Sequence, residues 1–341
     1  MEGMQQMTPK ATVLIPTKNG GARFAEVLAR VVMQKTPWPF DILVIDSGSN
    51  DGTLAVCQQY PQVRLHTIPP AEFGHGRTRN LGVSLSNAEF VAVITQDALP
   101  EHEQWLARMV AALETDANIA GAFGRHLPYE DANPFVKRDL ALHFDSFARQ
   151  SPVARLEDAE RYRREEGYRQ VLHFFSDNNA CIRRSVWERI PYPDVDFAED
   201  QIWAKQIIEA GYAKVYVDDA AVFHSHDFGI YETLRRSFDE SAAFRRLFGY
   251  RLCPTLRAAV RQSIRSGGAD ILYLLSRRRA IPGWTGWLLK APLLNIAKQL
   301  GFYLGSEWNH HPVVSRLSLD QSKKKYVGTP PTGSSESGAA K

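Results

Sequence analysis

The first third of the chain alternates short apolar runs with amphipathic segments, and this rhythm limits the folds that the chain can adopt. Apolar, β-branched runs at residues 11–15, 40–45 and 63–68 predict strands, and a fourth run covers residues 90–94. The segments between them place apolar residues at helical spacing, over residues 22–34, 53–60 and 77–85. Strands that alternate with helices indicate βαβ units and a mostly parallel sheet with helices on both faces. We therefore expect an α/β fold.

The rest of the chain continues this pattern and then becomes helical. Strands are predicted at residues 119–126, 171–183 and 213–223, and helices at residues 105–113, 131–168 and 200–210. After His226 the predicted elements are helices at residues 231–248, 256–276 and 281–308. We expect a flexible N-terminus (1–10), an α/β domain (11–249), a helical region (250–320) and a disordered Gly/Ser/Pro-rich tail (321–341).

Composition narrows the class of protein. With 341 residues and 44% hydrophobic content, the chain is long enough for one large domain, with or without a subdomain. A net charge of +3 does not argue for nucleic acid as a partner. The three cysteines lie far apart, which argues against a disulfide framework and fits a reducing cytoplasm. The polar first ten residues do not resemble a signal peptide, and no apolar run is long enough to span a membrane.

The predicted helix at residues 281–308 mixes leucines with Trp284, Trp287 and scattered lysines. Tryptophan and lysine beside apolar residues suit a helix that lies in a membrane interface. A helix packed on the α/β domain or on a second subunit, as in a homodimer, fits the sequence equally well. Both interpretations stay open at this point.

Asp97 follows the apolar run at residues 90–94, within the segment Thr95-Gln96-Asp97-Ala98. A carboxylate at the C-terminal end of a buried strand lies where open α/β sheets bind ligands. There it can hold a divalent cation such as Mg²⁺ against a diphosphate. The alternative is a helix N-cap. Acidic or polar clusters also follow the strands ending near residues 15 and 45, and carboxylates that converge at one edge favour the metal interpretation.

The segment Asp46-Ser-Gly-Ser-Asn-Asp-Gly-Thr53 forms a turn before the next helix. Asp51 suits a helix N-cap, and Asp46 is placed to accept a hydrogen bond from a ligand such as a pyrimidine base. The chain has neither a Gly-x-Gly-x-x-Gly motif in its first strand-to-helix turn nor a Gly-Lys-Ser/Thr loop. Dinucleotide-binding and Walker-type nucleotide sites therefore lack support.

Three further segments carry candidate functional groups. The first, Gly74-His75-Gly76-Arg77-Thr78-Arg79-Asn80, precedes a helix and suits a phosphate cradle, with a basic surface turn as the alternative. His224-Ser-His226-Asp227 ends the last strand, where one histidine would complete a metal site begun by Asp97, although both could be surface residues. Glu199 and Asp200 lie at a helix start, as N-terminal capping groups or as a general base.

Taken in order, these motifs resemble those of a known family. They are Pro16-Thr-Lys-Asn19, Asp46-Ser-Gly-Ser-x-Asp-Gly-Thr53, Phe73-Gly-His-Gly-x-Thr-Arg-Asn-Leu-Gly82, Thr95-Gln-Asp-Ala98, Ser176-Asp-Asn-Asn-Ala-Cys-Ile-Arg-Arg184, Glu199-Asp200 and His224-Ser-His-Asp227. Over residues 11–249 the chain resembles inverting family 2 glycosyltransferases of the GT-A fold, most closely bacterial rhamnosyltransferases of polysaccharide synthesis. The resemblance implies a Rossmann-like, mixed and mostly parallel sheet flanked by helices, with a C-terminal helical extension.

The resemblance also implies roles for the matching residues. The residues that would bind the nucleotide sugar are Pro16, Thr17, Asn19, Asp46, Ser49, His75, Arg77, Arg79, Asn80, Gln96, Asp97, Asp177 and Asn178. Asp97 would be the last acid of the Asp-x-Asp metal motif, with Thr95 replacing the first, and His224 or His226 would assist it. Asp200 would deprotonate the acceptor hydroxyl, with Glu199 as its neighbour or substitute.

The implied reaction is a single displacement with inversion, assisted by Mg²⁺ or Mn²⁺. The resemblance points to dTDP-β-L-rhamnose as donor and to a saccharide or lipid-linked saccharide as acceptor, at the cytoplasmic face of the inner membrane. Two alternatives belong to other classes: a sugar-phosphate nucleotidyltransferase, and a non-catalytic nucleotide-sugar-binding component of a polysaccharide assembly complex. Against the first, no Gly- and Lys/Arg-rich triphosphate signature lies near residue 18.

Overall fold

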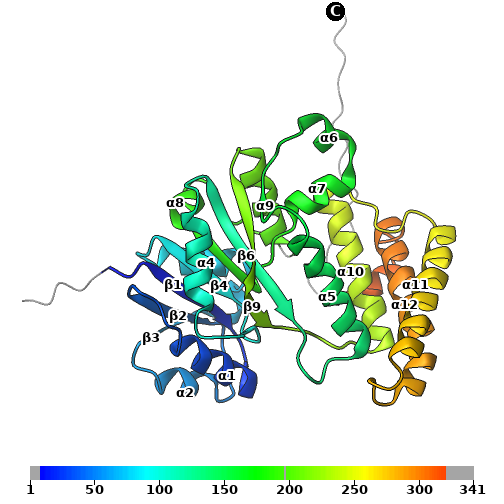
Figure 1. The fold of residues 1–341 in the computed structure, drawn as a ribbon, viewed down its shortest axis with the longest axis horizontal. Coiled ribbons are helices and arrows are strands. Elements are labelled where there is room, and N and C mark those ends of the chain that lie inside the picture. Colours follow the sequence, from blue (N-terminus) through cyan, green and yellow to red (C-terminus); the bar gives the residue numbers. More distant parts are fainter. Residues whose placement is uncertain (1–7, 196, 320–341) are drawn as a thin grey trace, which may run out of the picture. The chain divides into compact units, whose positions relative to one another are not determined.

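The chain forms two compact units that divide after Asp227 (Figure 1). The computed structural model describes residues 8–195 and 197–319. The boundary predicted after Gly249 lies at the end of a helix of the second unit. The predicted tail, residues 321–341, and most of the predicted flexible N-terminus, residues 1–10, lie outside the described residues.

The first unit is built on one mixed sheet with the strand order β3-β2-β1-β4-β8-β6-β9-β5, and β7 pairs with β9 (Figure 1). The strands are β1 (Ala11–Thr17), β2 (Phe40–Asp46), β3 (Val63–Thr67), β4 (Phe90–Ile94), β5 (Leu99–Pro100), β6 (Ile119–Leu127), β7 (Val153–Ala154), β8 (Asn179–Arg183) and β9 (Ala213–Phe223). Strands β1 to β4 are parallel, and β6 is parallel to β9. Strand β8 lies antiparallel between β4 and β6. The predicted mixed, Rossmann-like sheet is confirmed.

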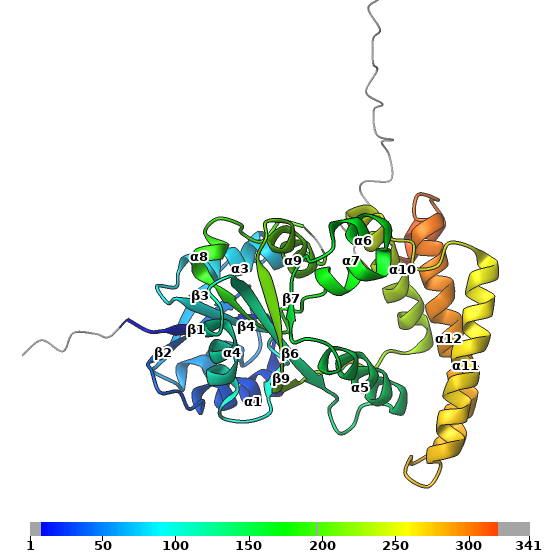
Figure 2. The same ribbon diagram turned by 45° about the horizontal axis from the view of Figure 1, so that its top comes forward.

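Helices cover both faces of this sheet (Figure 2). One face packs against α1 (Gly21–Val32), α2 (Thr53–Gln58) and α4 (Trp105–Glu114). The other packs against α3 (His75–Ser84), α5 (Pro134–Ala148), α7 (Glu166–His173), α8 (Arg184–Trp187) and α9 (Glu199–Glu209). Successive strand residues point to opposite faces, so Val13 and Ile15 enter the first core while Leu14 enters the second. Two buried faces explain why these strands read as continuous apolar runs.

The strand order predicts where the sheet would bind a ligand. From β1 the chain proceeds to β2 and β3 on one side and then crosses to β4 on the other side of β1. Ligands of open α/β sheets bind beyond the carboxyl ends of the strands where the order reverses in this way. Here those ends are Thr17, which is in register with Asp46, and Ile94.

Two predicted elements differ from the structure. The helix predicted at residues 131–168 is divided into α5, the strand β7, α6 (Ala159–Arg164) and the start of α7. The strand predicted at residues 171–183 is only β8, because residues 171–173 complete α7. Leu172 is buried and Val171 is exposed, which a helix achieves as readily as a strand. The two-residue strands β5 and β7 are too short to leave a sequence pattern. Pro100 is tolerated because β5 lies at the edge of the sheet.

The second unit contains α10 (Ile230–Phe248), α11 (Leu256–Arg277), α12 (Trp284–Glu307) and the short η2 (Val314–Leu317). Helices α10 and α12 pack closely at Gly301 and Gly305. A Cβ atom at these positions would lie 2.4 Å from the Leu234 carbonyl oxygen and 2.2 Å from that of Phe238. Glycine is therefore required at this contact. Within the described ranges, no helix is long and apolar enough to cross a membrane.

Candidate active site

The loops that follow β1, β2 and β4 are joined by side-chain hydrogen bonds. Gln96 accepts hydrogen bonds from the Thr17 hydroxyl and the Lys18 backbone N–H, both at 2.8 Å. The Asn19 backbone N–H donates to the Ser49 hydroxyl at 2.7 Å. These bonds confirm that the three polar clusters converge at one edge of the sheet.

Asp46 shapes the loop after β2. Its side chain is buried, and Oδ2 accepts hydrogen bonds from the backbone N–H groups of Gly48 and Ser49, each at 2.9 Å. Its other oxygen accepts a hydrogen bond from the Ser49 hydroxyl. Gly48 has a φ of +88°, which favours glycine. The Asp46 carboxylate therefore fixes the conformation of this loop beside β1. A contact between Asp46 and a nucleobase stays a prediction.

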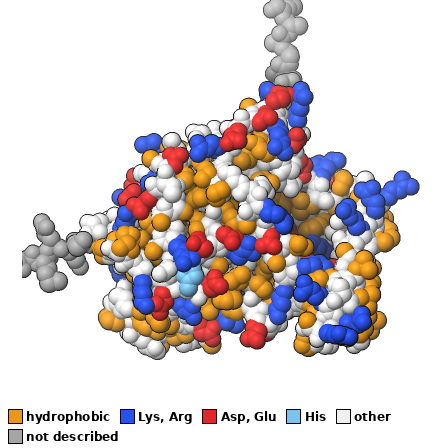
Figure 3. All heavy atoms as spheres, viewed as in Figure 1, with side chains coloured by type: hydrophobic (Ala, Val, Ile, Leu, Met, Phe, Trp, Pro, Cys, Tyr) orange, Lys and Arg blue, Asp and Glu red, His pale blue; other side chains and the backbone are white. Residues whose placement is uncertain are grey.

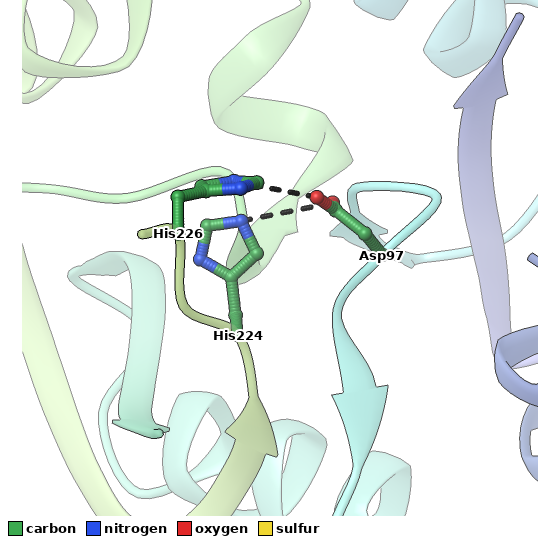
Figure 4. Close-up of side chains that lie close together, drawn as sticks. All are labelled: Asp97, His224 and His226. Carbon is green, nitrogen blue, oxygen red and sulfur yellow. Dashed lines mark ion pairs between the residues drawn. The ribbon is translucent and has the colours of Figure 1, made fainter. Parts of the chain in front are cut away.

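Asp97, His224 and His226 meet beyond the ends of β4 and β9 (Figure 4). The Nε2 atom of His224 lies 3.6 Å from Oδ1 of Asp97, and Nε2 of His226 lies 3.3 Å from Oδ2. One ligand atom from each residue fits within 4.8 Å of the other two. Two imidazoles and one carboxylate form a donor set that suits a divalent cation. Within the part of the chain that the structure describes, these three residues could hold a metal.

The environment of His224 suits metal binding. Burial lowers the pKa of its imidazole to about 4; the Asp97 carboxylate opposes this effect and His226 adds to it. The ring is therefore neutral near pH 7, with a nitrogen lone pair available for a cation. His126, which is buried on β6, packs edge-on against the His224 ring at a centroid distance of 5.4 Å.

Tyr129 anchors the loop that carries Asp97. Its hydroxyl donates a 2.9 Å hydrogen bond to the backbone carbonyl of Asp97, and its backbone N–H donates to the Ser225 hydroxyl at 3.0 Å. The Arg23 guanidinium lies 3.8 Å from the centre of the Tyr129 ring. Because Ser225 lies between the two histidines, Tyr129 links both halves of the candidate metal site.

A second cluster surrounds Arg79, which is only 5% exposed. Its Nε lies 3.0 Å from Oδ2 of Asp177, and one terminal nitrogen lies 2.6 Å from Oε1 of Glu199. The Tyr192 hydroxyl donates to Asp177 at 2.8 Å. The structure thus places Arg79 against carboxylates on the loop before β8 and at the start of α9.

Asp200 adjoins this cluster and accepts a 3.2 Å hydrogen bond from the backbone N–H of Asp177. Burial, together with the charges of Glu199 and Asp177, raises the pKa of Asp200 well above the usual value of a carboxyl. A carboxylate with a raised pKa takes up a proton more readily than an ordinary aspartate. Burial likewise raises the pKa of Asp177 to about 6.

The other predicted binding residues take varied positions. Arg77 is exposed and pairs with Asp194 at 3.3 Å, while His75 makes an edge contact with Phe73. Asn80 donates to the Tyr192 carbonyl at 2.8 Å and accepts from Trp187 at 2.7 Å. Two more are half-buried, in β1 and beside Asp177: Pro16 and Asn178.

Three residues of the site were not predicted from the sequence: His126, Tyr129 and Tyr192. Each is an isolated histidine or tyrosine outside the quoted motifs. His126 and Tyr192 are buried, so their side chains act through packing or through a neighbouring acid. Only their position in the fold relates them to Asp97 or Asp177.

The sequence profile described as Glycosyl transferase family 2 matches residues 12–190, which include the loops after β1, β2 and β4 together with Arg79 and Asp177 of the second cluster. The chain is also 33% identical over 315 residues to the O-antigen chain rhamnosyltransferase RfbN of Salmonella typhimurium, covering 89% of this chain and 92% of that protein. This chain belongs to glycosyltransferase family 2.

A second relative of this glycosyltransferase is the O-antigen chain rhamnosyltransferase WbaN of Salmonella anatum, at 31% identity over 89% of this chain and 92% of that protein. Among solved structures, a mannosyltransferase from Pyrobaculum calidifontis aligns with a TM-score of 0.54 and 18% identity, covering 89% of this chain and 88% of the other. These likenesses confirm the GT-A fold and a glycosyltransferase activity. They disfavour nucleotidyl transfer and non-catalytic binding.

Proposed function

We propose that this glycosyltransferase moves L-rhamnose from dTDP-β-L-rhamnose to a hydroxyl of a lipid-linked saccharide, with inversion, during O-antigen or related surface polysaccharide synthesis. The observation that carries the proposal is the similarity to two O-antigen chain rhamnosyltransferases over 92% of their lengths. The converging loops after β1, β2 and β4 supply the crevice in which the nucleotide would bind.

We also propose that the donor binds together with Mg²⁺ or Mn²⁺ at Asp97, His224 and His226. The neutral His224 ring and the mixed oxygen and nitrogen donor set fit such an ion. The solved mannosyltransferase is a complex with GDP-mannose and Mn²⁺, which supports this assignment. A bound cation would stabilise the negative charge of the departing nucleoside diphosphate. Because Thr95 replaces an acid, we expect tight metal binding only when the diphosphate is present.

Asp200 is the proposed general base. It would accept the proton of the attacking acceptor hydroxyl, and its raised pKa increases its affinity for that proton. Arg79 balances part of the charge of Asp177 and Glu199 and lowers the pKa of Asp200, which favours the ionised carboxylate that a base requires. We expect transfer to be slow at acidic pH, where Asp200 is protonated, and to become faster as the pH rises. The midpoint of this rise should lie above the pKa range of an ordinary aspartate.

The test uses the purified full chain, dTDP-rhamnose, Mn²⁺ and a lipid-linked saccharide acceptor. Asp200→Asn should lower transfer by about 100-fold or more while leaving dTDP binding intact. Glu89→Gln, at an exposed acid paired with Arg183 outside the site, is the control and should leave transfer unchanged. Undiminished transfer by Asp200→Asn would refute the assignment of the base. Preference for a different nucleotide sugar would refute the proposed donor.

An acceptor carried on a lipid requires the enzyme to reach a membrane. We propose peripheral contact at the cytoplasmic face of the inner membrane through the helical second unit. The alternative partner for this region is a second copy of the chain, as a homodimer.

A further inference from the structure

Helices α11 and α12 have an inverted distribution of polarity. Their outer surface carries large aliphatic side chains, with Ile264 71% exposed, Leu272 69% exposed and Leu289 76% exposed. On α11, exposed aliphatic residues recur every four positions at Leu256, Val260 and Ile264. This spacing forms a continuous stripe on one side of the helix.

The contact between the same two helices includes a buried polar pair, although Leu274 of α11 and Ala291 of α12 are buried as well. Asp270 of α11 is 5% exposed and Asn295 of α12 is 8% exposed, and the Asn295 amide donates a 2.7 Å hydrogen bond to the Asp270 carboxylate. Gln299 of α12 is also buried. Helices that face water normally bury their aliphatic residues and expose their polar ones. A pair that buries Asp270 and exposes Leu289 is suited to a partner that is itself apolar.

The net charge of α11 and α12 indicates which apolar partner they fit. Residues 256–307, from the start of α11 to the end of α12, contain eight Lys and Arg but two acids, the buried Asp270 and the terminal Glu307, so this segment carries +6 while the whole chain carries +3. All eight basic side chains are exposed. Arg257, Arg261 and Arg265 directly follow the aliphatic residues of the stripe. In Figure 3, hydrophobic and basic side chains lie together in the region where Figure 1 draws α11 and α12.

We propose that this face of α11 and α12 docks on an anionic lipid surface, with the aliphatic side chains in the acyl boundary and the arginines among the headgroup phosphates. Such a mixed basic and apolar face gains both hydrophobic and electrostatic binding energy at an anionic bilayer. A second copy would bring another +6 segment against the first, which is unfavourable. Nucleic acid would engage the arginines and leave the aliphatic residues exposed to water. The proposal deepens the peripheral membrane contact proposed above and rests on it.

The test is flotation of the full chain with vesicles that contain phosphatidylglycerol, compared with vesicles of phosphatidylcholine alone. We expect binding to the anionic vesicles, weakened by salt, and little binding to the neutral ones. Replacing Arg257, Arg261 and Arg265 with Gln should lower the partition coefficient on the order of 100-fold, since each basic residue near the surface contributes about fivefold. Ile264→Ser combined with Leu289→Ser should lower it by about tenfold or more.

Matched controls come from the first unit. Leu142→Ser changes a leucine that is 56% exposed on α5, and Arg163→Gln changes an exposed arginine on α6 (Ala159–Arg164). Neither should alter vesicle binding. Equal binding to both vesicle types would overturn the proposal, as would unchanged binding by the variants of α11 and α12. So would a dimer in solution that Leu289→Ser converts to a monomer, because the face would then bind a second copy.

The same preparation separates this proposal from the proposed reaction. Release of dTDP from dTDP-rhamnose, with a detergent-solubilised saccharide acceptor present to receive the rhamnosyl group and vesicles absent, reports the active site alone. A chain that releases dTDP but does not float with anionic vesicles overturns only the docking surface. A chain that floats but turns over no donor overturns only the proposed reaction.

Discussion

Arg79→Met tests whether this arginine serves the carboxylates of the site or the donor diphosphate. Its guanidinium lies within ion-pair distance of both Asp177 and Glu199, and all three side chains are buried. Removing one partner of a buried ion pair leaves an uncompensated charge and costs about 3–5 kcal/mol of stability. We expect a loss of that size at pH 7.5, measured by urea unfolding of the full chain.

The pH dependence of this loss makes the test specific. The pKa of Asp177 is already raised to about 6 by burial, and removing Arg79 raises it further because the arginine lowers it. At pH 5 the Asp177 carboxyl of the variant is protonated, and the loss should shrink to about 1–2 kcal/mol, the cost of unsatisfied neutral groups. Arg77→Met is the control, because Arg77 is 54% exposed and its pair with Asp194 contributes about 1 kcal/mol or less. An equal loss at both pH values would refute the reasoning, as would a stable variant with weakened dTDP binding.

Three further predictions follow from the structure. Asp97→Asn should weaken Mn²⁺ binding in the presence of dTDP by about tenfold or more, measured by calorimetry. The control His66→Gln should leave Mn²⁺ binding unchanged. Equal Mn²⁺ binding by Asp97→Asn and the unsubstituted chain would contradict the metal site. Gly305→Ala should lower the stability of the full chain in thermal unfolding by about 1–3 kcal/mol, because the added Cβ would lie 2.2 Å from the Phe238 carbonyl oxygen. The control is Gly268→Ala, whose added Cβ has no neighbour within 4 Å and should not destabilise the chain. Burial, with a smaller effect from Lys205, lowers the pKa of His173 from 6.5 to about 4. The unfolded state therefore binds the extra proton in this window, and stability should fall by about 3 kcal/mol between pH 6.5 and 4. His173→Gln should flatten that part of the profile, and an unchanged slope would contradict this account.

Local sequence patterns predict the sheet and part of the site. Runs such as residues 11–15 and 90–94 are apolar on both faces, so their period and length suffice to assign parallel strands. The meeting of Asp97 with His224 and His226 also follows from sequence, because each group directly follows a strand. Any residue at such a position is brought to the edge of the sheet.

The Arg79 cluster could not be predicted in the same way. Within the motif Gly74 to Asn80, Arg79 and Arg77 look equivalent, and phosphate binding suited both. In the fold Arg79 turns inward, where Glu199 lies 120 residues away in sequence and Asp177 lies on the loop before β8. That loop is set by β8, which runs antiparallel between β4 and β6. Neither the strand direction nor the partner of Arg79 has a local signal.

Backbone strain also marks the two halves of the proposed site. Among the described residues, positive φ outside glycine occurs at Asn19 and Ala198. Asn19 lies in the loop after β1, where its amide oxygen accepts a 2.9 Å hydrogen bond from the Asn50 backbone. Ala198 has no polar side chain that could form a compensating hydrogen bond, and it immediately precedes Glu199 and Asp200. An alanine in this region costs about 1–2 kcal/mol, which the surrounding contacts must offset. The ion pair between Arg79 and Glu199 supplies such a contact, so the same interaction that balances charge beside the proposed base also holds its strained helix start in place.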